Sequence, residues 1–303
     1  MVKDLGEDRL GKGITTVKFH PYRAEDYEDV CTFLIVLNQN DKRHINWNWA
    51  RFEWMMEHPE FDKSTIRSIG LWWERERLVG AAIYDMYFGE AFCAILPKYE
   101  MLYPEILEYA GRELKDETGL GISICDGHTR EIDAARAAGF VRADQSETVM
   151  KLDLDQAFSV ELPERLYFAE LDPATDAYTF QWLLWQGFDH GTNRTEFENS
   201  EHIIPQIRPH FKLHLSVAAV NAKKEPVSYC CLWFHEGTDY AYLEPVCTIP
   251  SCRGKGIAKA VIFEALNRVK ALGARWAYVI SDMEFYEKLG FRKDLHYSFY
   301  WKA

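Results

Sequence analysis

Residues 242–258 read YLEPVCTIPSCRGKGIA and join an apolar strand pattern over 240–248 to a long helical pattern over 256–272. Glycines 254 and 256 let the backbone turn tightly and let a ligand approach the chain closely. Successive N–H groups in such a turn can point into one concavity at the positive end of the helix, which suits a pyrophosphate. A glycine-rich loop of this length is a weak signal by itself, so a tight turn without a ligand is the alternative.

The elements around this loop are predicted twice along the chain. Each half reads strand, helix, helix, three strands, helix, strand, helix, strand. In the first half we expect strands at 17–20, 66–73, 78–86, 91–96, 121–125 and 148–154, and helices at 23–37, 47–57, 103–115 and 131–138. In the second half we expect strands at 166–170, 215–220, 227–234, 240–248, 276–280 and 297–300, and helices at 174–185, 199–207, 256–272 and 284–289.

This repeat predicts the fold class and the domain organisation. The pattern is typical of an α/β protein in which helices flank a mixed sheet. A length of 303 residues suits two domains of roughly 150 residues each, with the polar segment 151–164 as the seam. We therefore expect domains at 1–157 and 158–303.

Composition limits the partners and the compartment. The chain carries 35 Lys and Arg against 47 Asp and Glu, a net charge of −12, which argues against nucleic acid or an anionic membrane surface as a partner. No apolar run approaches a membrane span, and the first residues lack an apolar signal core, so we expect a cytoplasmic protein. The seven cysteines form no CxxC pair and no histidines cluster in the sequence, which predicts reduced structural thiols and no metal site. The sequence makes no prediction of the oligomeric state.

Two motifs with the spacing between them point to a family. The loop Arg253-Gly254-Lys255-Gly256-Ile257-Ala258 is followed about 30 residues later by Phe285-Tyr286-Glu287-Lys288-Leu289-Gly290-Phe291. This arrangement resembles the GNAT superfamily of N-acetyltransferases, whose signature Arg/Gln-x-x-Gly-x-Gly/Ala is met by Arg253, Gly256 and Ala258. The ending Tyr-x-x-x-Gly-Phe is met by Tyr286, Gly290 and Phe291. The resemblance covers about residues 165–303, with a degenerate copy over about 18–155, so the chain is similar to a tandem GNAT protein.

The resemblance implies acetyl-CoA as the co-substrate and assigns its contacts. The backbone of Val246, Cys247 and Thr248 would pair with the pantetheine arm, beside a β-bulge that splays the central strands. Main-chain N–H groups of Arg253, Gly254, Lys255, Gly256, Ile257 and Ala258 would hold the pyrophosphate, with positive charge from Arg253, Lys255 and Lys259. Many members place an Asn seven residues before the tyrosine; Val279 stands there, and Ser281 is the candidate substitute.

Catalysis would be direct attack of a neutral amine on the thioester. Tyr286 stands where the family places the general acid that protonates the departing thiolate, with a buried packing tyrosine as the alternative. An alkyl ammonium has a pKa near 10, so a base must remove its proton. Glu244 is the first candidate because it lies two residues before Val246 and therefore on the same strand face; the alternative is a solvated or substrate-orienting carboxylate. Tyr242 shares that face.

The acceptor is less defined. An aromatic wall with one carboxylate is available on the acceptor side from Trp182, Trp185, Phe188, Asp189 and His190, although core packing of the two tryptophans is the alternative. We expect a small-molecule or peptide amine. Residues 1–157 carry a net charge of −10 and residues 158–303 a net charge of −2, which favours a cationic amine if the acidic half faces the cleft.

The first copy lacks the residues of both motifs. Aligning the two copies by their strand and helix ends puts Glu100 in place of the arginine, Tyr103 in place of the second glycine and Ala135 in place of the tyrosine. We predict no CoA site there. The sequence thus favours an N-acetyltransferase with one site, against a non-catalytic acyl-CoA sensor or scaffold, or a transferase that uses another acyl donor.

Overall fold

A computed structural model describes residues 16–303 except 201 and 207. The first half contains strands β1 (Val17–Pro21), β2 (Gly70–Glu74), β3 (Arg77–Tyr84), β4 (Glu90–Ile95), β5 (Leu120–Cys125) and β6 (Val141–Asp153), and helices α1 (Tyr27–Asn40), α2 (Trp49–Met56), α3 (Tyr103–Glu113) and α4 (Thr129–Ala137). The second half contains strands β7 (Tyr167–Glu170), β8 (Ser216–Val220), β9 (Pro226–Phe234), β10 (Tyr240–Thr248), β11 (Trp276–Ile280) and β12 (Arg292–Lys302), and helices α5 (Ala177–Gly187), α6 (Arg194–Glu198), α7 (Ile257–Ala271) and α8 (Glu284–Lys288). The mixed α/β class is confirmed.

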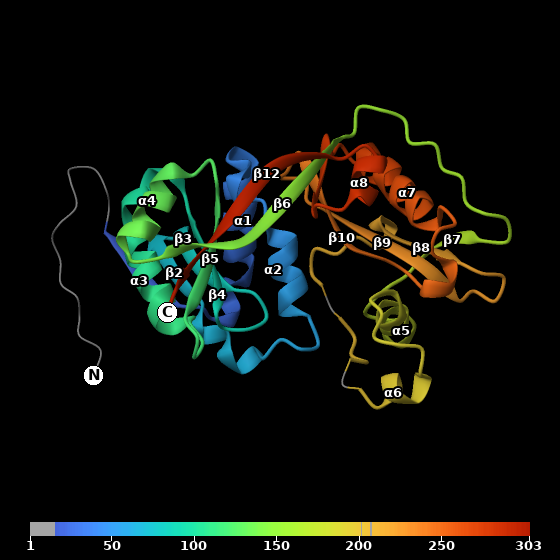
Figure 1. The fold of residues 1–303 in the computed structure, drawn as a ribbon, viewed down its shortest axis with the longest axis horizontal. Coiled ribbons are helices and arrows are strands. Elements are labelled where there is room, and N and C mark those ends of the chain that lie inside the picture. Colours follow the sequence, from blue (N-terminus) through green and yellow to red (C-terminus); the bar gives the residue numbers. More distant parts are fainter. Residues whose placement is uncertain (1–15, 201, 207) are drawn as a thin grey trace.

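All twelve strands form one sheet in the order β1-β2-β3-β4-β5-β12-β6-β11-β10-β9-β8-β7. The two halves exchange their last strands. β12 pairs with β5 of the first half, β6 pairs with β11 of the second half, and β6 and β12 pair with each other between them. Figure 1 shows these two strands running between the two lobes. Each half of the sheet is therefore completed by a strand from the other half.

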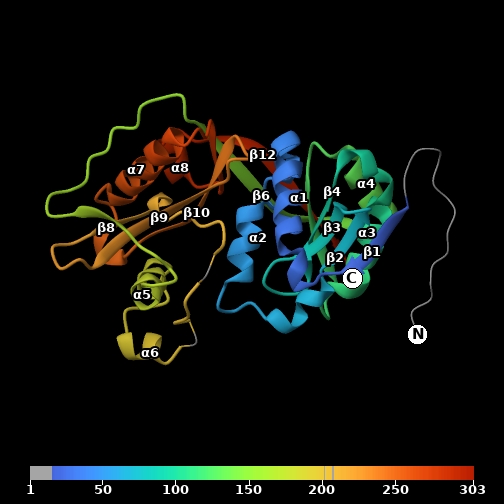
Figure 2. The same ribbon diagram turned by 180° about the vertical axis from the view of Figure 1, so that it is seen from behind.

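Helices cover both faces of the second half. α7 and α8 lie on one face of β8–β10, and α5 and α6 lie on the other (Figures 1 and 2). The core on the α7 face contains Leu243, Val261 and Tyr286. The core on the α5 face contains Tyr242, Cys247 and Phe180 and is continuous with the core of the first half. The two halves consequently share one hydrophobic core on the α5 face.

Helix α2 lies on the side of the first half that faces α5 (Figures 1 and 2). Asn48 begins this helix by accepting hydrogen bonds from the backbone N–H groups of Ala50 and Arg51 at 3.0 and 3.3 Å. The ring of Trp49 lies 6.0 Å from the ring of Trp233 in β9, measured between centroids. The cap and this contact position Arg51 at the junction of the halves.

The predicted helix over 199–207 is wrong. A shorter helix, α6, precedes it, beginning after Asn193, which accepts hydrogen bonds from Thr195 and Glu196. The described residues from 202 to 210 form turns and irregular backbone. Pro205 and Pro209 explain this, because proline lacks the N–H that a helix needs and restrains the residue before it.

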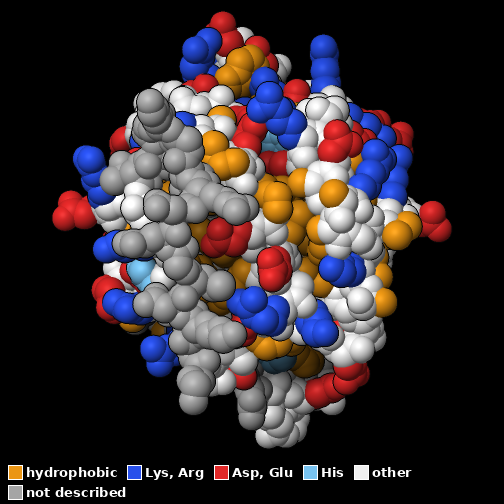
Figure 3. Space-filling model, turned by 90° about the vertical axis from the view of Figure 1, so that its left-hand side faces the viewer, with side chains coloured by type: hydrophobic (Ala, Val, Ile, Leu, Met, Phe, Trp, Pro, Cys, Tyr) orange, Lys and Arg blue, Asp and Glu red, His pale blue; other side chains and the backbone are white. Residues whose placement is uncertain are grey.

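The surface of the first half is mixed in charge. Figure 3 shows acidic and basic side chains interspersed with hydrophobic ones on the face seen at the left of Figure 1. The acidity of this half is therefore not gathered into one patch on that face. None of the helices in the described part of the chain has the length and apolar character that crossing a bilayer requires.

Candidate active site

The central strands of the second half separate at the carboxyl end of β10. β10 pairs with β11 only over Tyr240–Tyr242, and its register against β9 shifts between Leu243 and Val246. Beyond the shift, residues 246–248 pair with β9 alone among the described strands. This bulge and splay were expected, and they leave one edge of Val246, Cys247 and Thr248 open to an extended ligand.

The loop after β10 has an open concavity at the start of α7. Gly254 and Gly256 both have left-handed backbone, with φ of 73° and 77°. A Cβ added at either glycine would meet nothing within 4 Å, so the space above the loop is free. Gly256 precedes the 15-residue helix α7, and no side chain caps it. The first N–H groups of α7 therefore remain available to an anion.

The side chain of Arg253 turns toward α5. Its guanidinium donates to the carbonyl of Thr248 at 3.0 Å, to the carbonyl of Gly187 at 2.8 Å and to Asp189 Oδ2 at 3.0 Å. The carboxylate of Asp189 thus compensates the positive charge of Arg253, which was expected to lie near a pyrophosphate. Lys255 folds back onto the carbonyl of Ser251 at 2.8 Å. The structure gives Arg253 a role in positioning the loop against α5.

Glu244 faces the first half of the chain. Tyr242 donates its hydroxyl to Glu244 Oε2 at 2.7 Å, and Trp233 donates its indole N–H to the carbonyl of Glu244 at 2.7 Å. Tyr242 belongs to the core on the α5 face, whereas Val246 packs against the core on the α7 face. The sequence argument that placed Glu244 and Val246 on the same face is wrong, because the bulge between them breaks the alternation of side chains.

Three charged residues of the first half surround Glu244. Arg51 of α2 pairs with Asp85, which follows β3, at 3.0 Å, and with Glu147 of β6 at 3.5 Å. Their side chains are only 18–24% exposed. Burial raises the pKa of Glu244, as do Asp85 and Glu147, while Arg51 and the Tyr242 hydrogen bond act in the opposite direction. Sequence analysis missed these residues, because only the packing of the two halves brings them to β10.

Tyr286 lies across the splay from Glu244. It is 9% exposed in α8, and its ring packs on Phe285 and Phe291 at 5.1 and 5.7 Å between centroids. Burial raises the pKa of Tyr286, and the charge of Glu244 adds to this. The hydroxyl is therefore protonated at neutral pH, which is the form that a general acid requires. A carboxylate and a phenol from opposite faces of the sheet flank the gap between β10 and β11.

The other predicted contacts take up structural positions around the gap. Ser281 accepts from the N–H of Met283 at 3.1 Å, and its own N–H donates to Thr148 of β6 at 2.9 Å. Thr248 shares a hydroxyl hydrogen bond of 2.8 Å with Ser228. Cys247 is buried against Gly187, where an added Cβ would lie 2.6 Å from the Cβ of Cys247.

The residues of the expected aromatic wall lie along α5 and the turn that follows it. Trp182 and Trp185 are partly exposed and pack on Phe197 of α6 at 5.0 and 5.7 Å between centroids. The ring of His190 is tilted against that of Trp185, 5.2 Å away between centroids, and the carboxylate of Asp189 pairs with Arg253. These tryptophans therefore hold α6 onto α5, which matches neither a core position in the sheet nor a free wall.

Comparison with known proteins bears on this geometry. Residues 175–291 match the model of the acetyltransferase (GNAT) family. The second half carries a GNAT domain. A search of curated protein sequences gives no significant match.

Solved structures show the fold of the whole chain. A tandem GNAT protein from the clavulanic acid biosynthesis pathway is similar with a TM-score of 0.61 and 16% identity over 95% of this chain and 98% of that chain. A GCN5-related N-acetyltransferase from Sphaerobacter thermophilus is similar with a TM-score of 0.55 and 14% identity over 94% of this chain and 95% of that chain. N-myristoyltransferase from Saccharomyces cerevisiae, solved with myristoyl-CoA, has a TM-score of 0.54 and 13% identity over 98% of this chain and 82% of that chain. The chain thus has the fold of a tandem GNAT protein.

The described part of the first half has no counterpart of the open loop of the GNAT domain. Glu100 pairs with Arg130, and Tyr103 begins α3 with its ring buried. Ala135 occupies a fully buried position in α4. The prediction that this half binds no CoA stays a prediction.

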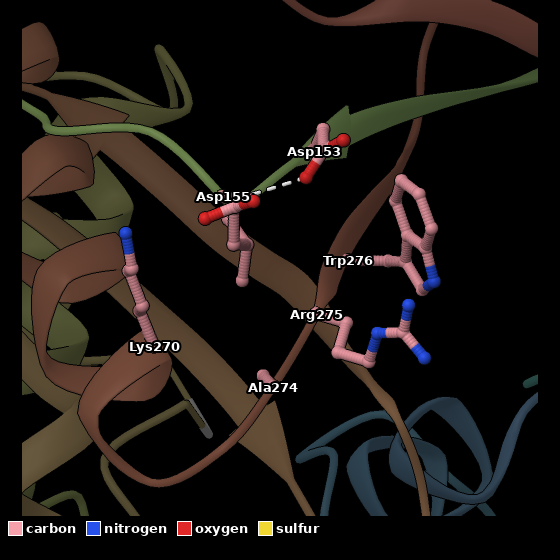
Figure 4. A pocket seen from close by; sticks show the side chains of 7 residues that line it. Asp153, Asp155, Lys270, Ala274, Arg275 and Trp276 are labelled. Carbon is pink, nitrogen blue, oxygen red and sulfur yellow. Dashed lines mark hydrogen bonds between the residues drawn. The ribbon is translucent and has the colours of Figure 1, made fainter.

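A cavity of about 330 Å³ lies away from the GNAT site. Figure 4 shows its lining from the start of β11, the end of α7 and the residues after β6, with the backbone N–H of Asp155 bonded to Asp153 at 2.8 Å. It contains none of the residues that flank the gap between β10 and β11. Its mixed charges, Asp153 and Asp155 opposite Lys270 and Arg275, largely compensate one another.

Proposed function

We propose that the protein transfers an acetyl group from acetyl-CoA to a primary amine of a small molecule or peptide, at one site in the GNAT domain. The observation that carries the proposal is the open, left-handed Gly254–Gly256 loop beside the unpaired edge of β10. The family match supports acyl transfer in general. In this proposal residues 158–303 hold the cofactor, and residues 1–157 supply one wall of the acceptor site.

The residues around the gap support direct transfer. Glu244 accepts the proton of the ammonium group, and the neutral nitrogen forms a bond to the thioester carbonyl carbon. The carbon–sulfur bond then breaks, the nitrogen loses its second proton to solvent, and the hydroxyl proton of Tyr286 passes to the thiolate, giving the neutral amide and free CoA. A backbone N–H near Val246 would stabilise the oxyanion. Solvent returns a proton to Tyr286 and removes one from Glu244, which restores the enzyme.

A cationic acceptor is the substrate class that the site favours. Glu244, Asp85 and Glu147 converge with Arg51 as their basic neighbour. Glu147 Oε2 is buried with no hydrogen-bond partner among the described residues, so it can accept from an ammonium group. We expect a panel of amines, followed by CoA thiol release, to give higher kcat/KM for diamines or basic peptides than for anionic amines. Preference for anionic amines would contradict this assignment.

Cofactor binding is tested by a matched pair at Gly256. Asp and Asn tolerate left-handed backbone better than other side chains, so neither should unfold the loop. Gly256→Asp places a carboxylate in the phosphate concavity, and calorimetry with acetyl-CoA should show a loss of affinity of at least tenfold relative to Gly256→Asn. Gly273→Asp, at the left-handed glycine beyond the other end of α7, is the positional control and should bind normally. Equal binding by all variants would place the cofactor elsewhere.

A non-catalytic acyl-CoA sensor remains the alternative because Val279 replaces the usual Asn. Tyr286→Phe separates the two functions. An enzyme should lose roughly 10²–10⁴-fold in kcat with little change in the affinity for acetyl-CoA. A sensor would show no turnover in the wild type with any amine. Competition between acetyl-CoA and longer acyl-CoA esters identifies the donor.

A further inference from the structure

We propose that His44, His128 and Glu131 form a binding site for a divalent transition metal of the zinc class in the first half of the chain. His44 ends the short turn Lys42–His44 after α1, His128 directly precedes α4, and Glu131 lies in the first turn of α4. Their side chains are 8–11% exposed, and one ligand atom of each lies within 4.8 Å of the others.

The two imidazoles approach the carboxylate of Glu131, each at a different oxygen. His44 Nε2 lies 3.5 Å from Glu131 Oε1, and His128 Nδ1 lies 3.1 Å from Glu131 Oε2. Ligands about 2.0–2.1 Å from a tetrahedral Zn²⁺ are about 3.4 Å apart. His128 Nδ1 is buried and makes no hydrogen bond despite its short distance to Glu131. This nitrogen and the carboxylate are thus close without being aligned to each other, as expected of two groups directed at a shared third point.

A second carboxylate orients His128. His128 Nε2 lies 3.3 Å from Asp41 Oδ2, and Asp41 in turn accepts from Arg43 Nε at 2.9 Å and from Arg43 Nη2 at 2.6 Å. A proton on Nε2 that is shared with Asp41 leaves the lone pair of Nδ1 free for a metal. Metal-binding histidines commonly have such a carboxylate partner on the other ring nitrogen.

The site is specific to the first half. Matching Ala135–Phe140 with Tyr286–Phe291 places Val279 and Asp282 of the GNAT domain opposite His128 and Glu131. The sequence prediction of no metal site is revised by this proposal, because 84 residues separate His44 from His128 and no motif spacing marks them. The site lies at the start of α4, the counterpart of the helix that carries Tyr286.

A second group of possible ligands, Cys31, Glu53 and His210, is already satisfied. Glu53 accepts from the hydroxyl of Tyr27 at 2.8 Å, from the N–H of His210 at 3.0 Å and from His210 Nδ1 at 2.7 Å. Burial raises the pKa of the Cys31 thiol and keeps it protonated. This group therefore links the two halves, and its carboxylate and imidazole are already paired with each other.

The test is metal binding by the full chain after chelator treatment. Titration with Zn²⁺ against a chromophoric chelator should give one ion per chain, and Co²⁺ should give the visible absorption of a tetrahedral centre. His44→Ala and His128→Ala should weaken Zn²⁺ binding at least 100-fold, and Asp41→Asn should weaken it roughly 10–100-fold. His296→Ala is the matched control, since this exposed histidine of β12 pairs with Asp126 of the first half at 2.8 Å, and its loss should leave binding unchanged.

Glu131→Gln tests the metal site if a histidine variant fails to fold, because glutamine keeps the shape of the side chain and removes its charge. Weaker Zn²⁺ binding by a folded Glu131→Gln protein supports the site. The proposal is overturned if the wild type takes up no stoichiometric Zn²⁺, or if Glu131→Gln binds as tightly as the wild type. Neither readout depends on acetyl transfer, so this result stands apart from the proposed activity.

Discussion

Glu244 lies among charges that come from both halves of the chain. Tyr242 belongs to its own strand, whereas Arg51, Asp85 and Glu147 come from three separate elements of the first half. Because burial raises the pKa of Glu244, this carboxylate binds its proton at a higher pH than an exposed glutamate would. Activity that depends on its charged form is therefore lost as the pH falls through that raised pKa.

Replacing Glu244 tests its role as the base. Glu244→Gln keeps an oxygen for the Tyr242 hydroxyl and removes the proton acceptor, so we expect kcat/KM to fall by roughly 10²–10⁴-fold. The acid limb of the pH profile should disappear with it. Glu284→Gln, at an exposed pair with Lys288, is the control and should behave as the wild type. An acid limb retained by Glu244→Gln would show that another group takes the proton.

Arg51, a residue of the first half, acts to lower the pKa of Glu244. Its charge favours the ionised carboxylate, so Arg51→Met should raise the pKa of Glu244 and move the acid limb of kcat/KM to higher pH. The variant also leaves Asp85 and Glu147 without their cation, and we expect the free energy of unfolding to fall by roughly 1–3 kcal/mol. Arg51→Lys keeps the charge, and its acid limb should shift less. Identical acid limbs in the wild type, Arg51→Met and Arg51→Lys would show that Arg51 does not affect the pKa of Glu244.

At this scale the sequence predicted residues in motifs and missed those brought together by packing. Arg253, Gly256 and Tyr286 were found because their spacing along the chain is fixed by one loop and one short helix. The partner of Arg253 was not found, because Asp189 approaches it only when α5 packs on β10. The assignment of Arg253 and Gly256 to cofactor binding and of Tyr286 to catalysis stays a prediction.

At the scale of elements, the close packing of α5 on β10 depends on one glycine. An added Cβ at Gly187 would lie 2.6 Å from the Cβ of Cys247 and 2.7 Å from its sulfur. The carbonyl of Gly187 also accepts from Arg253, so this contact connects α5 to the cofactor loop. The end of α5 and the loop should therefore move together.

Alanine at two helical glycines tests this packing. Gly187→Ala should lower the free energy of unfolding by roughly 1–3 kcal/mol in urea titrations, because a buried contact becomes overpacked. Gly111→Ala in α3 meets nothing within 4 Å and should instead stabilise by about 0.5–1 kcal/mol. Equal stability of Gly187→Ala and the wild type would mean that α5 is free to move away from β10.

Elements with a strong local pattern were predicted well, and those stabilised by distant partners were not. Helix α7 is 15 residues long and carries an apolar face along its whole length, so its period is plain in the sequence. Strands β6 and β12 are longer than predicted, at 13 and 11 residues, because much of their length is polar and is stabilised by pairing with each other. Periodicity cannot detect a pairing between residues about 150 positions apart.

At the scale of the molecule, the exchange of strands joins the two halves. β6 pairs with β11 from Val149 to Asp153, and β12 pairs with β5 from Tyr297 to Lys302. The sequence predicted the repeat, and its similarity to a tandem GNAT protein is confirmed by the fold. It could not predict the exchange, because a strand pattern in the sequence does not say which strands pair. The boundary at residue 157 therefore divides the repeat without dividing the sheet.

Cutting the connection between the halves should leave them together. A protease site placed between Ser159 and Glu161, after β6, interrupts neither β6 nor β12. After cleavage, we expect the two fragments to elute as one species in size-exclusion chromatography and to separate only in denaturant. The uncut protein gives the reference elution volume. Two separate peaks under native conditions would show that the strand exchange does not hold the halves.

The exchanged strand β12 also fixes the order in which the sheet can be completed during synthesis. β5 ends at Cys125, but its partner in β12 begins at Tyr297, more than 170 residues later. At about 5–20 residues per second, a ribosome needs roughly 10–40 s to cover that distance. Throughout that interval the nascent first half has an unpaired β5 edge, the kind of edge that invites association with other chains. Completion of the earlier half therefore waits for translation of the later one.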